Sequence, residues 1–188
     1  GFDTAPGIVA WYSATDMDGD GEDDLGTTHQ NGQSVNSWKD ASGFGRDMTS
    51  VRDNPTYMGF ALNEKPVINF DGDDMIWGGT NFNFLTKTGY TIFVLARYTG
   101  GDNERVISSR NINWLFGFHG QRIGRWYANG WINYGIIPDT EWHLQVGAIE
   151  KESNPKAWMW MDGQQTTTGS TASNDTNFSP GQLQFGGY

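Results

Sequence analysis

The sequence predicts an all-β protein, an antiparallel β-sandwich of the jelly-roll type with calcium-binding loops and little helix. Three observations predict this fold. The 26 glycines among 188 residues are about twice the average share of ~7%, and glycine at that density disfavours helices and marks turns. Short runs rich in β-branched and aromatic residues recur, separated by turn pairs such as Asn129-Gly130. No long segment repeats apolar positions with the period of a helix.

Each β-rich run is expected to form one strand of a single domain that covers residues 1–188. The runs are 7–12, 66–70, 90–98, 105–109, 114–119, 122–128, 142–149 and 157–161. Two hairpins are predicted, one joining 122–128 to 131–137 through Asn129-Gly130 and one joining 157–161 to 164–168 through Asp162-Gly163. The run 90–98 is almost continuously apolar, which predicts a central strand covered on both faces.

Composition excludes several classes of function. The chain has 12 Lys+Arg against 22 Asp+Glu and a formal net charge of −10, and its basic residues are scattered, which argues against nucleic acid and anionic membranes as partners. It contains no run of the ~18 apolar residues that a membrane span needs, so no membrane insertion is expected. With no cysteine, disulfides and thiolate metal sites are excluded. An acidic, cysteine-free chain suits a bacterial exterior.

The strongest local signal is the acidic loop at residues 16–24. Aspartates at alternate positions, followed by a glycine, match the first half of an EF-hand loop, and Ca²⁺ binds six to eight oxygen ligands. The predicted ligands are Asp16, Asp18, Asp20, Glu22 and Asp24. Position 12 is Thr27 in place of the expected Glu, so this is a calcium loop in a β protein and not an EF-hand. The alternative is a solvated acidic turn without an ion.

Two further acidic loops, 71–74 and 100–105, each follow or adjoin an expected strand. Loops held by a rigid sandwich are common binding sites, although Asp-Gly and Asp-Asn also suit plain polar turns. Arginines gather in the middle third of the chain, and a guanidinium there can clamp a carboxylate. The candidate ligand-binding residues in this region are Gly101, Arg110 and Asn111.

Aromatic residues are concentrated between positions 114 and 134. Trp126 and Trp131 are candidates for stacking on a ligand, although most tryptophans in a sandwich are buried. Strand alternation places Trp126 and Tyr127 on opposite faces, so one of the two points outward.

Catalysis is not expected. Glucanases on such folds need two carboxylates on one cleft face, and only Glu150 and Glu152 have a suitable spacing, directly before a turn. The three histidines show no metal-binding spacing, and no nucleophile-elbow Gly-x-Ser-x-Gly occurs.

Several segments resemble bacterial laminin-G-like, concanavalin-A-like jelly rolls. They are IVAWY at 8–12, WKDASG at 38–43, KPVINFDGDD at 65–74 and YTIFVLA at 90–96. The calcium loop and YTGGDNER at 98–105 further resemble the ligand-binding domains near the distal end of large RTX adhesins. That resemblance implies metal-ligand roles for Asp73, Asp102 and Asn103.

The resemblance implies a calcium-dependent, non-catalytic domain at the bacterial cell surface, active in adhesion and biofilms. Its expected partner is the C-terminus of an extracellular peptide or protein, bound through a loop-held Ca²⁺. The alternative is a calcium-dependent lectin that binds surface glycans, and a glucanase-like enzyme is a weaker third reading. We expect a monomeric module of a larger protein.

Overall fold

The computed structural model describes residues 7–87, 89–100, 105–150, 156–171 and 178–187. The chain divides into two compact units, Gly1–Thr80 and Asn81–Tyr188, and each is described by itself. Nearly all of the regular structure in the described residues is β-strand, and they contain no α-helix. None of their helical segments has the length and apolar character that a membrane-spanning helix requires. The all-β prediction is therefore confirmed.

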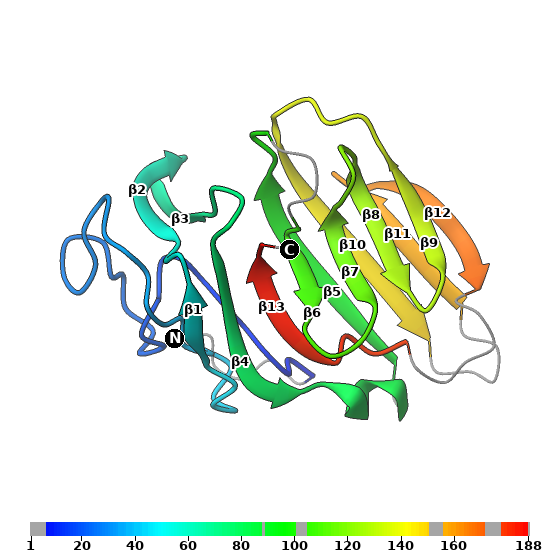
Figure 1. Ribbon diagram of the computed structural model, residues 1–188, viewed down its shortest axis with the longest axis horizontal. Helices are drawn as coiled ribbons and strands as arrows, with labels where there is room; N and C mark the ends of the chain where they lie inside the picture. Colours follow the sequence, from blue (N-terminus) through cyan, green and yellow to red (C-terminus); the bar gives the residue numbers. More distant parts are fainter. Residues whose placement is uncertain (1–6, 88, 101–104, 151–155, 172–177, 188) are drawn as a thin grey trace. The chain divides into compact units, whose positions relative to one another are not determined.

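The first unit contains two antiparallel strand pairs joined by long irregular loops (Figure 1). β1 (Met48–Arg52) pairs with β4 (Met75–Asn81), and β2 (Thr56–Leu62) pairs with β3 (Lys65–Asn69). Asn63 and Glu64 connect β2 to β3 with positive φ angles of 48° and 61°, as a two-residue hairpin turn requires. Val35, Met48, Tyr57 and Ile76 are fully buried and form the core of this unit.

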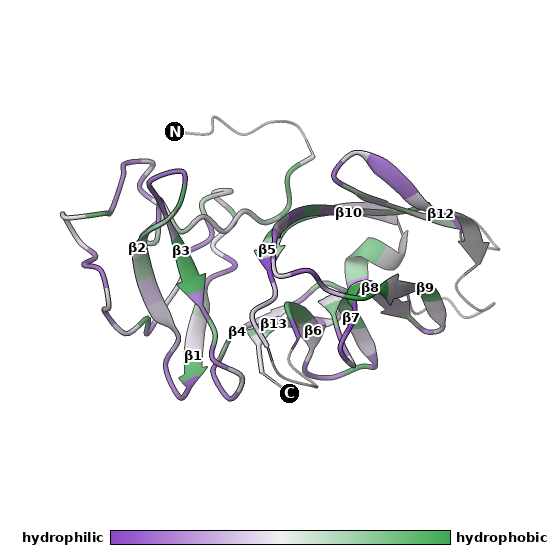
Figure 2. Cartoon of the chain, turned by 90° about the horizontal axis from the view of Figure 1, so that it is seen from above, coloured by the Kyte–Doolittle hydropathy of each residue, from purple (hydrophilic) through white to green (hydrophobic). Residues whose placement is uncertain are grey.

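The second unit contains two antiparallel sheets. One runs in the order β12-β11-β10-β5, and the other contains β13-β6-β7-β8-β9. Figure 2 shows the two as separate layers. A short 3₁₀ helix, η1 (Asn83–Lys87), precedes β5. The strands are β5 (Gly89–Arg97), β6 (Ile107–Ser109), β7 (Trp114–Phe118), β8 (Ile123–Ala128), β9 (Trp131–Ile136), β10 (Trp142–Glu150), β11 (Lys156–Met161), β12 (Gln164–Thr171) and β13 (Gln182–Gly186).

Large aromatic side chains fill the space between these two sheets. Trp114, Phe116 and Trp126 on the inner face of β7 and β8 are fully buried. Gly147 on β10 lies against two of them, because a Cβ there would lie 2.6 Å from Phe116 Cε2 and 2.9 Å from Trp126 Cζ3. Across the layers, Trp114 Nε1 donates to the Tyr90 hydroxyl at 3.0 Å. These contacts are those of a β-sandwich with a single aromatic core.

Most strand predictions are confirmed. Seven of the eight runs fall on strands, and so do the second strands of both hairpins. The run 7–12 is the exception, because its backbone bonds to a loop: Trp11 N donates to Asp40 Oδ1, and Ala41 N donates to Trp11 O. The sequence analysis also missed four strands, β1, β2, β4 and β13.

The predicted central position of run 90–98 is wrong. Its strand, β5, lies at the end of the four-stranded sheet and pairs with β10 alone within it. Phe93 is 65% and Leu95 54% exposed. Apolar side chains therefore occupy both faces of this strand although only one face packs in the core.

We predict that Gly147→Val lowers the free energy of unfolding by about 1–3 kcal/mol, the usual cost of forcing extra atoms into a packed core. Chemical or thermal unfolding measures the change. Gly79→Ala is the control, since a Cβ at Gly79 meets nothing within 4 Å. Equal stability of the Gly147→Val variant and the wild type would contradict the sandwich packing.

His143 joins two loops at one end of the second unit. Its Nδ1 lies 2.6 Å from Asp162 Oδ2 in the β11–β12 turn, and its Nε2 lies 2.9 Å from Asp139 Oδ1 before β10. Burial alone lowers the pKa of His143, but the hydrogen bonds and charges of the two aspartates outweigh it and raise the pKa above its ordinary value. The same contacts lower the pKa of Asp139 and of Asp162.

Because the pKa of His143 is raised in the folded state, its stabilising contribution is complete below its ordinary pKa of ~6.5 and is lost as the pH rises through the folded value. We predict that His143→Gln lowers the melting temperature more at about pH 5.5 than at about pH 9. Paired thermal scans at the two pH values measure this. A deficit that does not change with pH would contradict the charged contact.

Candidate functional site

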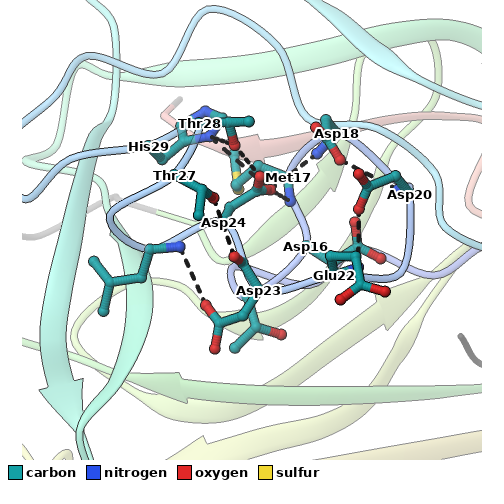
Figure 3. Close-up of polar contacts among 12 residues, drawn as sticks. Asp16, Met17, Asp18, Asp20, Glu22, Asp23, Asp24, Thr27, Thr28 and His29 are labelled. Carbon is teal, nitrogen blue, oxygen red and sulfur yellow. Dashed lines mark hydrogen bonds and ion pairs between the residues drawn. The ribbon is translucent and has the colours of Figure 1, made fainter.

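Three carboxylates of the acidic loop lie close together in the first unit. Asp16, Asp18 and Asp24 each offer an oxygen within 4.8 Å of the others. Figure 3 shows them within one turn of the loop. Asp24 is 3% exposed, whereas Asp18 faces solvent and Asp16 is half-buried. The loop therefore brings one buried and two more accessible carboxylates to a common point.

Asp24 organises this loop from inside. Its Oδ2 accepts hydrogen bonds from Met17 N and from Asp18 N at 3.2 Å, and its Oδ1 accepts one from Thr28 Oγ1. Its backbone carbonyl accepts bonds from Thr27 N at 3.1 Å and His29 N at 3.0 Å. Buried carboxylate oxygens need hydrogen-bond donors, and both side-chain oxygens of Asp24 have them. Asp24 thus fixes both ends of the acidic segment.

Two further loop amides bond to aspartate side chains. Asp20 N donates to Asp18 Oδ1 at 3.2 Å, and Gly21 N donates to Asp16 Oδ2 at 3.1 Å. Gly19 and Gly21 have φ angles of 75° and 91°, which favour glycine. The other oxygen of Asp16, Oδ1, is buried without a hydrogen-bond partner among the described residues. A buried anionic oxygen without a donor is costly, and a cation would satisfy it.

Two predicted ligands of this loop lie outside the cluster. Asp20 Oδ1 accepts a hydrogen bond from Glu22 N at 2.8 Å, so this oxygen stabilises the turn. Glu22 is exposed, and neither residue belongs to the group of three. Desolvation raises the pKa of Asp18, and the charges of Asp24, Asp20 and Asp16 add to the rise, against a lowering by the hydrogen bond from Asp20 N. The charges of Asp16, Asp20 and Asp24 therefore repel the charge of Asp18.

A second acidic triad lies in the loop before β4. Asp71, Asp73 and Asp74 also offer oxygens within 4.8 Å of one another. Asp74 is 3% exposed, and its Oδ2 accepts Asp71 N at 3.0 Å. Burial, with repulsion from Asp71 and Asp73, raises the pKa of Asp74 to about 6. Asp71 and Asp73 face solvent, so this triad has an open side.

The guanidinium of Arg52 donates its hydrogen bonds in the second triad to a backbone carbonyl and not to a carboxylate. Its Nε and Nη2 donate to the Asp73 carbonyl at 3.2 and 3.1 Å. This leaves the carboxylate of Asp73 available to a cation. The acidic loop 71–74 was recognised in the sequence, but only Asp73 was predicted as a ligand, whereas all three of its acids converge in the structure.

Other predicted site residues belong to the second unit. Gly101, Asp102 and Asn103 lie outside the described residues. Arg110 is exposed, and its Nη1 donates to Gln184 Oε1 at 3.4 Å. Asn111 Oδ1 accepts Gln182 N at 2.8 Å and Ser109 Oγ at 3.0 Å, so this oxygen holds the loop against β13.

One aromatic prediction needs correction. Trp126 is 0% exposed and packs between the sheets, so it cannot stack on a ligand; Tyr127 is the member of that pair that faces outward. Trp131 remains partly exposed on β9. The exposed Tyr134 beside it was not singled out as a candidate from the sequence.

Fold and sites together define an all-β protein with two clusters of carboxylates in its first unit. Comparison with known proteins adds no nearer identification: no family model, no curated protein and no solved structure matches this chain. The resemblance to laminin-G-like domains and to RTX adhesins stays a prediction.

We predict that Asp24→Ala lowers the free energy of unfolding in excess chelator by about 1–3 kcal/mol, because Met17 N and Thr28 Oγ1 lose their acceptor. Asp18→Ala removes the same charge from an exposed position and should change stability by less than about 0.5 kcal/mol. Denaturant unfolding compares the two variants. Equal losses would show that Asp24 does not organise the loop.

Proposed function

We propose that this chain is a calcium-dependent, non-catalytic ligand-binding domain of a bacterial surface adhesin. One observation carries the proposal: the first unit contains two groups of three carboxylates, each with ligand oxygens within 4.8 Å of one another. Ca²⁺ prefers carboxylate oxygens and tolerates irregular loop geometry. Extracellular calcium is abundant enough to saturate sites of modest affinity.

The two triads would serve different purposes. Asp24 of the first triad is buried and bonded to the loop on several sides. An ion there would compensate Asp16 Oδ1, which is buried without a hydrogen-bond partner among the described residues. We assign this first ion a structural role, because its ligands also determine the loop conformation.

The second triad is better suited to bind a ligand. Only Asp74 is buried, and the carboxylates of Asp71 and Asp73 face solvent. Three carboxylates leave some of the six to eight coordination positions of Ca²⁺ to other oxygens. We propose that the terminal carboxylate of an extracellular peptide or protein fills such a position, because carboxylate oxygens are preferred ligands of Ca²⁺.

A calcium-dependent lectin is the second candidate. The observation that favours it is the exposed Tyr134 beside Trp131 in the second unit, since aromatic rings stack on sugars. Competition by free monosaccharides distinguishes the two candidates, because it should displace a glycan and leave a bound peptide in place.

The test uses a peptide array with free C-termini, screened with the whole chain in calcium and in chelator. We expect the enriched peptides to lose binding at least about tenfold in chelator and when their C-terminus is amidated. Calorimetric titration with Ca²⁺ should reveal two sites in the wild type and one in Asp73→Asn, which should also lose the peptide. Glu64→Gln, an equal charge change at an exposed turn, is the control.

Peptide binding that survives both chelation and amidation would refute the proposal. So would unchanged calcium stoichiometry in Asp73→Asn.

A further inference from the structure

Cationic and aromatic side chains gather on the outer face of the sheet in the second unit that contains β8 and β9. Arg125 pairs with Tyr134 across these strands, and Tyr127 pairs with Trp131. The intervening residues Trp126 and Ile132 are buried. On β8, alternation around the buried Trp126 directs Arg125 and Tyr127 outward. Their cross-strand partners Tyr134 and Trp131 share this face because the β8–β9 register shifts between the two pairs. β8 and β9 are neighbours in Figure 1.

The rings on this face form one continuous group. The ring centres of Trp131 and Tyr134 lie 5.8 Å apart, with 30° between the ring planes. The ring centres of Tyr127 and Trp131 lie 5.2 Å apart in an edge-to-face arrangement. The guanidinium carbon of Arg125 lies 4.7 Å from the centre of the Trp131 ring. Tyr134 is 66% exposed. The Tyr134 ring is thus open to solvent, beside a half-buried Trp131 ring that also contacts the Arg125 guanidinium and stacks with His119.

Two arginines are held against the same short segment of β9. Arg125 Nε donates to Tyr134 O at 3.0 Å, and Arg122 Nη1 donates to Gly135 O at 3.4 Å. Their stems meet at Gly135, where a Cβ would lie 2.9 Å from Arg125 Cγ and 3.2 Å from Arg122 Cβ. A Cβ there would also lie 2.3 Å from the backbone oxygen of Ile123, so glycine at this position lets β8 and both arginine stems approach β9 closely.

The charges of these arginines are not balanced locally. Among the described residues, no carboxylate forms an ion pair with Arg122 or Arg125. Burial and the charge of Arg122 lower the pKa of Arg125. Two neighbouring arginines without an acidic partner among the described residues are unexpected in a chain of net charge −10, because it has more acidic than basic residues. An anionic ligand would relieve their repulsion.

We infer that Arg122, Arg125, Trp131 and Tyr134, here called the arginine–aromatic face, bind an acidic saccharide that carries carboxylate or sulfate groups. Guanidinium groups bind both anions through paired hydrogen bonds. The apolar face of a sugar ring packs on an aromatic ring. An acidic peptide carries its carboxylates on flexible side chains and has no sugar ring to pack on the exposed Tyr134 ring beside Trp131. The saccharide therefore matches this face better than the peptide does.

This site is independent of the calcium-dependent peptide site proposed above, and it gives the Trp131–Tyr134 pair of the lectin candidate a ligand that needs no calcium. None of its residues belongs to either acidic triad, and it lies in the other compact unit. Its ligand is held by side-chain cations and not by a metal ion. Binding to it should therefore persist in chelator, which removes calcium-dependent binding, so failure of one proposal leaves the other standing.

The experiment is calorimetry of the whole chain in excess chelator with three defined probes: an oligogalacturonate, a sulfated galactan oligosaccharide, and an unsulfated galactan oligosaccharide of equal length. We expect binding of one or both acidic probes and none of the neutral probe. The two acidic arms distinguish carboxylate from sulfate as the recognised group. Added salt should weaken the binding.

Three variants test the residues. Arg125→Gln and Arg122→Gln should each weaken binding about tenfold, and Tyr134→Ala should weaken it about three- to tenfold. Arg97→Gln is the matched control, because it removes the same charge from an exposed arginine on β5, in the other sheet of the same unit. Melting temperatures confirm that each variant is folded.

Four results would overturn the inference. They are no binding of either acidic probe, equal binding of the neutral probe, unchanged affinity in both arginine variants, and equally tight binding of oligoglutamate that Arg125→Gln weakens to the same degree. The last result would show that the face recognises negative charge on a peptide and not a saccharide.

Discussion

Repulsion between neighbouring carboxylates is the constraint on which this account of the first unit depends. Two groups of three acids have oxygens within 4.8 Å of one another, and like charges at such separations disfavour full ionisation. Protons or a cation must compensate them. Burial and acidic neighbours raise the pKa of Asp74 to about 6, which favours compensation by a proton at this residue. A bound calcium ion would compensate the charges instead.

Hydrogen bonds within the two loops offset part of this repulsion. Asp24 is an acceptor for Met17 N and Thr28 Oγ1, and Asp74 is an acceptor for Asp71 N. In each triad one buried carboxylate therefore holds the loop in place through hydrogen bonds. The other two carboxylates of the triad lie close to it because they belong to the same short loop. The same residues that fold the loops also form the two carboxylate clusters, so a cation bound there would also stabilise the loops.

The sequence predicted the parts of the molecule that depend on local patterns. The acidic loop follows from alternate aspartates and glycines, and both hairpins follow from their two-residue turns. The errors concern facts that no local pattern records. Apolar residues on both faces of β5 suggested a central strand, yet Phe93 and Leu95 are exposed at the end of a sheet. Likewise, strand alternation placed Trp126 and Tyr127 on opposite faces of the strand, but it did not show which of the two faces the core.

Site prediction was limited in the same way. Asp20 and Glu22 have the spacing of calcium ligands, but the Asp20 side chain caps the Glu22 amide. Asp71 and Asp74 fit a polar turn equally well until their convergence on Asp73 is known. The arginine–aromatic face depends on the β8–β9 register and on the close approach of Arg122 and Arg125 at Gly135, which only the folded structure provides.

An anomalous-scattering map from crystals grown with a calcium-mimicking lanthanide ion tests the central claim most directly. The account predicts one peak bounded by Asp16, Asp18 and Asp24 and a second bounded by Asp71, Asp73 and Asp74. The second ion should have coordination positions that no protein atom fills. A map without a peak at either triad, at lanthanide concentrations that saturate known calcium loops, would contradict it.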